Sequence, residues 1–159
     1  MLDPDLGRLP QPAKGLLAYW NEHCPAGGLP DRSVFDPLSL RPYLGNLLIV
    51  DVEATAGAAA SGQSERRFRY RLIGTDVAAM SGRDMTGRYF EDVYDPVALA
   101  EMRHCFGWVV DHRRPARIFG TFRHANRAFL GFDGMFLPVA TDRGSIVAQV
   151  IGYIISNKS

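Results

Sequence analysis

The residues of this chain that could transfer a proton are a few carboxylates and histidines. An enzyme needs such a group beside a substrate pocket, where it acts as general acid or base. Six acids are candidates for this role: Asp76, Asp84, Glu91, Asp92, Asp95 and Asp133. Nearly all of them stand where helix caps and turns favour acidic residues. The sequence also lacks a Ser/His/Asp set, a phosphate-binding loop and a dinucleotide glycine motif. We therefore predict no catalytic residue.

Metal ligation is the second chemistry that this residue set could support. The candidate ligands are His23, Cys24, His104, Cys105, His112 and His124. None of them forms a histidine pair at i,i+4 or a Cys-x-x-Cys motif, which are common spacings of metal ligands. We predict no metal site, and we interpret Cys24 and Cys105 as buried thiols of a protein in a reducing cytosol.

Composition narrows the class of partner. The chain has 159 residues, 47% of them hydrophobic and 22% charged, which are the values of a single globular domain. Its net charge of +1 gives no general attraction to nucleic acid or to an anionic membrane. No stretch has the roughly 18 apolar residues of a membrane span, and the acid- and proline-containing N-terminus is unlike a signal peptide. We predict a cytoplasmic protein that binds neither nucleic acid nor membrane.

A β-strand is indicated by residues 66–74, where Phe68, Tyr70 and Leu72 alternate with arginines. A period of two puts the apolar residues on one face of a sheet, which something else must cover. Gly74 then lets the strand turn without the steric penalty of a Cβ atom. A short helix follows and carries Val77 and Met80 inward, and the segment 81–87 is punctuated by glycines.

The remaining elements follow from periodicity and from caps. Residues 1–12 are proline-containing and predict a flexible leader, and residues 54–64 predict a hairpin loop. An amphipathic helix is expected over residues 13–24, and a longer helix over residues 96–112, capped by Asp95. Further strands are expected at residues 47–53, 116–123, 128–139 and 145–155, the last three forming a meander with connections at 124–127 and 142–144.

This order of elements predicts an α+β fold within a single domain, residues 13–157. Five antiparallel strands form its sheet. The helices between the second and third strands lie over one face of it, and the N-terminal helix flanks the domain.

These elements and two sequence stretches resemble the PAS domain, and in particular a family of stand-alone bacterial PAS-like proteins common in α-proteobacteria. The stretches are LPDRSVFDPLSLRPYLGNLLIVDVE at residues 29–53 and FRYRLIGTDVAAMSGRDMTGRYFEDV at residues 68–93. The resemblance implies a five-stranded PAS sheet, a cavity between sheet and helices, and a sensory or partner-binding role in signal transduction. It implies no known ligand.

Large aromatic residues and glycines share the predicted strands, and this mixture favours an apolar cavity for a small apolar or aromatic ligand. We predict that its lining includes Phe68, Tyr70, Leu72, Met80, Met102, Phe106 and Phe132. The cofactor is unknown. Haem-binding PAS sensors ligate iron through a histidine on the long helix, but His104 stands about 200° around that helix from Phe106, so we expect no haem there. The cysteine motif of flavin photosensors is absent.

The N-terminal helix carries an apolar stripe of Leu16, Leu17 and Trp20, which packs either on the domain's own sheet or on a second copy. We predict a homodimer with these residues as its interface. Nothing in the chain resembles a kinase, a cyclase or a DNA-reading helix, so the output of a non-catalytic sensor is expected to pass through a separate, unknown partner. Two alternatives remain open: a small cavity enzyme of the isomerase or hydratase type, and a dimeric scaffold with a filled core.

Overall fold

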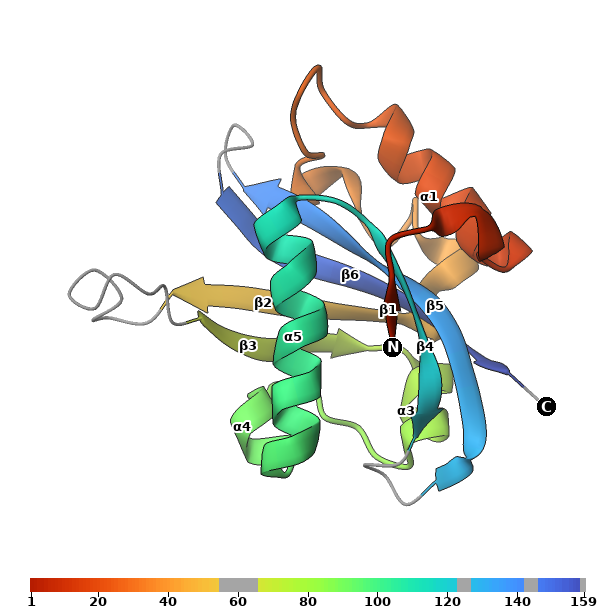
Figure 1. Ribbon diagram of the computed structural model, residues 1–159. Coiled ribbons are helices and arrows are strands. Elements are labelled where there is room, and N and C mark those ends of the chain that lie inside the picture. The colour runs from red at the N-terminus through yellow and green to blue at the C-terminus, as the bar shows by residue number, and fades with distance from the viewer. Residues whose placement is uncertain (55–65, 123–126, 142–145, 158–159) are drawn as a thin grey trace.

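A six-stranded antiparallel sheet, in the order β1-β4-β5-β6-β2-β3, organises the molecule (Figure 1). The computed structural model describes residues 1–54, 66–122, 127–141 and 146–157. The strands are β1 (Leu2–Asp3), β2 (Leu47–Ala54), β3 (Arg66–Ile73), β4 (Ala116–Phe122), β5 (Arg127–Thr141) and β6 (Ile146–Asn157). Strands β2 to β6 confirm the five predicted strands. The predicted loop at 54–64 and the connections at 124–127 and 142–144 lie largely outside the described residues.

Helices lie on both faces of this sheet. They are α1 (Gln11–Glu22), α3 (Thr75–Ser81), α4 (Phe90–Val93) and α5 (Pro96–His112), with 3-10 turns η1 (Leu6–Arg8), η2 (Arg32–Val34) and η3 (Arg41–Asn46). Helix α5 has the predicted bounds, because Asp95 accepts a hydrogen bond from the Ala98 N–H at 2.9 Å and Pro96 fits its first turn. In Figure 1, α5 crosses the front of the sheet. No helix in the described part of the chain is long and apolar enough to span a membrane.

The two faces of the sheet bury separate clusters of apolar side chains. On the first face, Phe136, Val150 and Ile154 pack with residues of α3, α4 and α5, as predicted. On the second face, Met135 and Ile151 pack with residues of α1. The central strands carry apolar residues on both sides, as strands covered on two faces do. The flanking helix α1 therefore covers the face that the other helices leave open.

The amphipathic helix α1 docks through the stripe that the sequence indicated. Leu16 is fully buried and Trp20 is 7% exposed, both in the second cluster. The Trp20 indole N–H donates to the carbonyl oxygen of Pro138 at 2.8 Å. Strand β4 pairs with β5 only as far as Phe136, so Pro138 faces no residue of β4. Its missing N–H therefore costs no hydrogen bond on that side of β5.

The N-terminal segment differs from the flexible leader that its prolines predicted. Leu2 and Asp3 form β1, an edge strand that pairs with Ile118 and Arg117 of β4. Asp5 then caps η1, its carboxylate accepting from the Gly7 N–H at 2.9 Å. A strand of two residues has no detectable periodicity, and its register is set by β4, which lies far away in the sequence.

One predicted cavity residue, Leu72, lies on the wrong face for that role. The β2–β3 ladder pairs Val50 with Tyr70 but Ile49 with Leu72, which leaves Arg71 as an extra residue in a β-bulge. The bulge reverses the alternation, so Leu72 turns away from the first cluster and is 36% exposed. Ile73 takes its place against the first cluster.

Gly74 is required at the end of β3 for a reason other than the turn itself. Its φ of −65° and ψ of 155° are open to most residues. A Cβ atom there would lie 2.3 Å from the carbonyl oxygen of Leu44 and 2.4 Å from that of Gly45. The backbone of η3 thus approaches β3 so closely that no side chain fits. This contact holds η3 against the start of α3.

Candidate ligand cavity

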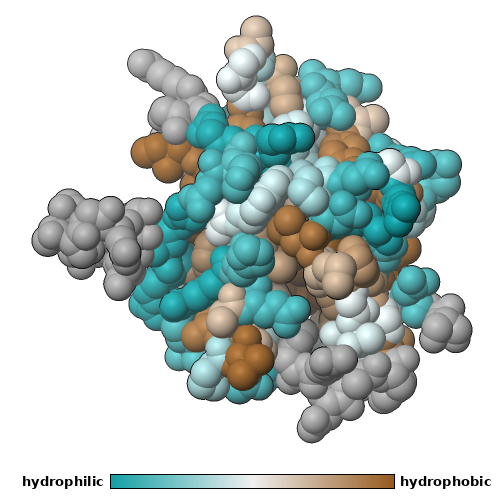
Figure 2. Space-filling view, viewed as in Figure 1, coloured by the Kyte–Doolittle hydropathy of each residue, from teal (hydrophilic) through white to brown (hydrophobic). Residues whose placement is uncertain are grey.

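A cavity of about 760 Å³ lies between the first face of the sheet and helices α3 and α5. Its apolar lining comes mainly from the sheet and from α5: Leu48, Val77, Met85, Ala98, Met102, Cys105, Ile118, Phe122, Phe132, Phe136 and Ile154. Figure 2 shows apolar side chains gathered in the middle of this face, where the surface is hollowed. The volume falls within the range of small-molecule sites, roughly 300–1,000 Å³.

The mouth of the cavity is marked by lining residues that are also exposed. Val97 on the first turn of α5 is 80% exposed, and Met1 beside β4 is 71% exposed. Glu101 and Asp95 also line the cavity and are exposed. The cavity therefore opens to solvent between the N-terminal half of α5 and the β1–β4 edge of the sheet.

Three of the seven predicted lining residues lie in this cavity: Tyr70, Met102 and Phe132. Phe68 and Phe106 lie beside it in a closed aromatic cluster, and Met80 is buried in the first cluster without lining the cavity. Leu72 is excluded by the bulge. The cavity and the predicted lining thus share three residues, and the other four predicted residues lie elsewhere.

The aromatic cluster explains why Phe106 does not line the cavity. Its ring centroid lies 4.1 Å from that of Phe136, 5.1 Å from Phe90 and 5.7 Å from Phe68. Phe106 is fully buried among these rings. Four rings at these separations fill the space under the middle of α5. The cavity begins where this filling ends, one helical turn earlier, at Met102.

Two tyrosine hydroxyls and the Ser81 hydroxyl are the polar side-chain groups among the buried lining residues. The Tyr70 and Tyr94 hydroxyls are hydrogen-bonded to each other, and both rings are buried. Burial raises the pKa of Tyr70 well above its usual value, and the neighbouring Tyr94 adds to this shift. Burial also raises the pKa of Tyr94 to about 12. The pair is therefore neutral at physiological pH and offers a ligand hydrogen bonds rather than a charge.

Several residues that line the cavity are not indicated by any pattern in the sequence. Tyr94 stands in the short link before α5, where nothing in the pattern indicates that its hydroxyl meets Tyr70. Ile118 and Phe122 lie on β4, and their inward direction follows only once that strand is placed in the sheet. Gly120, one of the glycines on the predicted strands, also lines the cavity. A Cβ atom there would lie 3.3 Å from the ring of Phe132.

The six candidate acids have structural roles or lie away from the cavity interior. Asp84 accepts from the Thr86 N–H at 2.9 Å, and hydrogen bonds from Thr86 lower its pKa. Burial opposes ionisation of Glu91, but its hydrogen bond from Arg103 and other contacts leave its pKa below the usual value. Asp133 is bound bidentately by Arg117. Asp76, Asp92 and Asp95 are exposed.

His104, the one residue considered for haem ligation, is exposed on α5 and does not line the cavity. Instead, Cys105 is the neighbour that does, and burial raises the pKa of its thiol. No cluster of three or more metal-ligating side chains occurs among the residues that the structure describes.

The residues predicted for a dimer interface are mostly used within the protomer. Leu16 and Trp20 are buried against the sheet, and Leu17 alone of the three is half-buried. A second copy could reach Leu16 and Trp20 only if α1 left its own sheet.

Comparison with known proteins gives one match. The family model described as "PAS domain" matches residues 9–155, nearly the whole described fold from the end of η1 to β6. No curated protein and no solved structure matches the chain significantly.

Proposed function

This chain belongs to the PAS domain family, and we propose that it is a non-catalytic sensory module that holds a small, neutral, apolar or aromatic molecule in its cavity. Members of this family generally serve as sensory or binding modules. The observation that carries the proposal is the cavity of about 760 Å³, lined by apolar side chains and with one neutral tyrosine pair at its inner wall. An apolar space with few polar groups is typical of a small-molecule site.

The charges at the mouth support a neutral ligand. The described lining residues carry two exposed carboxylates, Asp95 and Glu101, and one cation, the α-ammonium of Met1, which donates to the Phe119 carbonyl oxygen at 2.6 Å. These charges partly offset one another, so a carboxylate or sulfonate gains little attraction at the mouth and loses its hydration inside the apolar cavity. A neutral ring system instead gains from contact with Phe122, Phe132 and Phe136, and a single polar atom can bond to the tyrosine pair.

The alternative of an isomerase or hydratase has less support. Such an enzyme needs a buried carboxylate with a raised pKa that faces the substrate. The carboxylates at this cavity are at its exposed mouth, and Asp84 and Glu91, whose pKa values are lowered, lie outside it. The filled-core scaffold is less favoured because of the cavity itself. Output through a separate signalling partner remains part of the proposal.

A matched pair of fluorescent probes tests this function. N-phenyl-1-naphthylamine is neutral and apolar, and 8-anilino-1-naphthalenesulfonate adds a sulfonate to the same ring system. We expect one N-phenyl-1-naphthylamine to bind with a Kd on the order of 1–100 µM. We expect the sulfonate to bind at least about tenfold more weakly, which corresponds to a cost of roughly 1.4 kcal/mol for its lost hydration. Fluorescence titration measures both. Equal binding of the two probes, or no saturable binding of the neutral one, would contradict the proposal.

A further inference from the structure

The first eight residues, here called the N-terminal strap, pass around the β4 edge from one face of the sheet to the other. Leu2 packs against the first cluster, on the cavity side. Leu6 packs against the second cluster, where Leu9 and Ala13 are buried just beyond the strap. The strap is thus a short covalent connection between the cavity mouth and α1.

The attachment of the strap to β4 is small. Leu2 pairs with Ile118 and Asp3 with Arg117. At Phe119, the N–H donates to the Met1 carbonyl oxygen at 3.0 Å and the carbonyl oxygen accepts from the Met1 α-ammonium at 2.6 Å. All three of these β4 residues border the strap, and two of them, Ile118 and Phe119, line the cavity. A ladder of two residue pairs at the edge of a sheet belongs to the least stable part of a fold.

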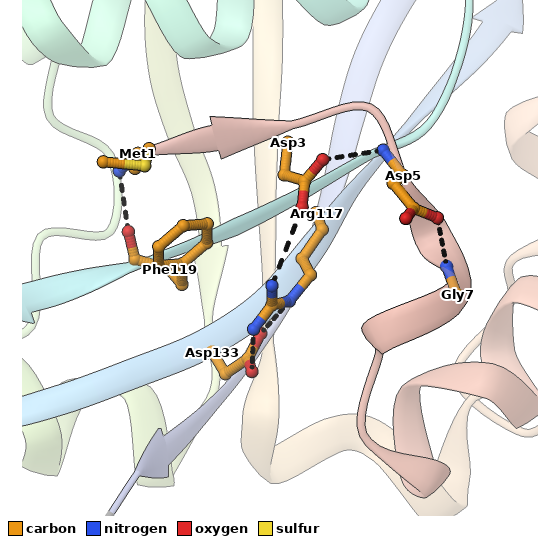
Figure 3. A network of polar contacts seen from close by, with 7 residues as sticks. All are labelled: Met1, Asp3, Asp5, Gly7, Arg117, Phe119 and Asp133. Atoms are coloured by element: carbon orange, nitrogen blue, oxygen red, sulfur yellow. Dashed lines mark hydrogen bonds and ion pairs between the residues drawn. The ribbon is translucent and has the colours of Figure 1, made fainter.

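Arg117 contacts the strap through Asp3, and this ion pair is the weaker of the two that Arg117 makes (Figure 3). Its guanidinium binds Asp133 bidentately, with N···O distances of 3.0 and 2.7 Å. The second partner, Asp3, lies 3.8 Å from Arg117 Nη1. If Asp3 moves away, Arg117 keeps its bidentate partner Asp133. Release of the strap therefore leaves no buried charge unpaired. Asp3 also accepts from the Asp5 N–H at 2.9 Å, which shapes the strap itself.

We propose that the N-terminal strap is a releasable gate that narrows the β1–β4 side of the cavity mouth, and that its displacement carries cavity occupancy to α1. Met1 lines the mouth, and Leu2 covers the first cluster beside it. A ligand that fills the mouth competes with these side chains for the same space. Release of Leu2 and Asp3 then frees the chain that enters η1 and α1. A ligand shifts this equilibrium by its difference in affinity for the closed and the open states. The inference rests on the proposed function, because a gate has meaning only for a cavity that takes up ligand.

The thiol of Cys105 reports opening of the gate without any ligand. Cys105 lines the cavity and is 8% exposed. In a Cys24→Ser background it is the one thiol of the chain, which contains two cysteines. Its reaction with 4,4′-dithiodipyridine releases one thiopyridone, and the rate of release measures access to the cavity.

Two variants loosen the gate in different ways. Asp3→Asn removes the charge that faces Arg117 but keeps an oxygen for the Asp5 N–H, and we expect the labelling rate to rise about two- to fourfold. Leu2→Ala removes the apolar contact, and we expect a rise of about fivefold or more. As a matched control, Asp111→Asn breaks the exposed Arg66–Asp111 pair, which lies away from the mouth, and we expect it to leave the rate unchanged.

A second control separates gate opening from global unfolding. Val139→Ala shortens a fully buried side chain of the second cluster and lowers global stability, and it changes no contact between the strap and β4. If the strap acts as a gate, Cys105 reacts with the reagent at the same rate in Val139→Ala as in the parent protein under native conditions. Unchanged rates in Asp3→Asn and Leu2→Ala, or an equal rise in Val139→Ala, would overturn the inference. Because no ligand is present, failure of the gate is distinguishable from a cavity that binds no probe, which the titration above reports separately.

Discussion

Ala98→Trp is expected to lower the affinity for N-phenyl-1-naphthylamine at least about tenfold, which corresponds to a loss of roughly 1.4 kcal/mol of binding free energy. Ala98 stands in the first turn of α5, is half-buried, and lines the cavity. Its side chain packs against the first cluster. An indole at this position occupies the space between α5 and the sheet that the probe would take. Fluorescence titration of the variant measures the loss.

Ala100→Trp is the matched control on the same helix. Ala100 is exposed and does not line the cavity. Two residues along an α-helix turn the side chain by about 200°, so an indole at residue 100 points away from the cavity. We expect this variant to bind the probe as the parent protein does. Equal affinity in both tryptophan variants would show that the probe binds somewhere other than the cavity.

Phe106→Ala is expected to lower the free energy of unfolding by about 3–5 kcal/mol. Phe106 is fully buried and packs against the rings of Phe68, Phe90 and Phe136. Its removal leaves a hole among rings that cannot collapse without moving α5 from the sheet. Domains of this size are stable by only about 5–15 kcal/mol, so the loss is a large part of the total. Urea denaturation followed by tryptophan fluorescence measures it.

Phe132→Ala provides the comparison, because the same change is made at the cavity wall. Phe132 is half-buried and already borders open space. We expect a loss of stability of roughly 1 kcal/mol from the apolar area removed, together with weaker probe binding. If Phe106→Ala costs no more stability than Phe132→Ala, then Phe106 lines an open space, as the sequence predicted, and the closed aromatic cluster is wrong.

The fold was predictable wherever a pattern repeats within one element. Alternation of apolar residues gave β2 and the last three strands within a few residues of their bounds. The Asp95-Pro96 cap and the apolar stripe gave α5 its ends. Local signals of this kind act within a few residues, where caps and periodicity decide the structure.

Features that depend on distant contacts were not predictable. β1 exists because β4 offers it an edge, and two residues carry no pattern. The bulge at Arg71 reversed the direction of Leu72, since a shift of one residue exchanges the faces of a strand. Whether an inward aromatic fills the core or lines a cavity depends on its neighbours across the sheet. Phe106 meets three rings, whereas Phe132 lies opposite Gly120 and meets the one ring of Phe122. No spacing in the sequence distinguishes the two.

The proposed ligand-holding role is tested most directly by native mass spectrometry of freshly purified protein. We predict a species heavier than the 17.6 kDa chain by the mass of one small, neutral organic molecule. This species should shift to the mass of the bare chain in Ala98→Trp and persist in Ala100→Trp. A bare chain in every preparation that also fails to take up added N-phenyl-1-naphthylamine would contradict a ligand-holding cavity.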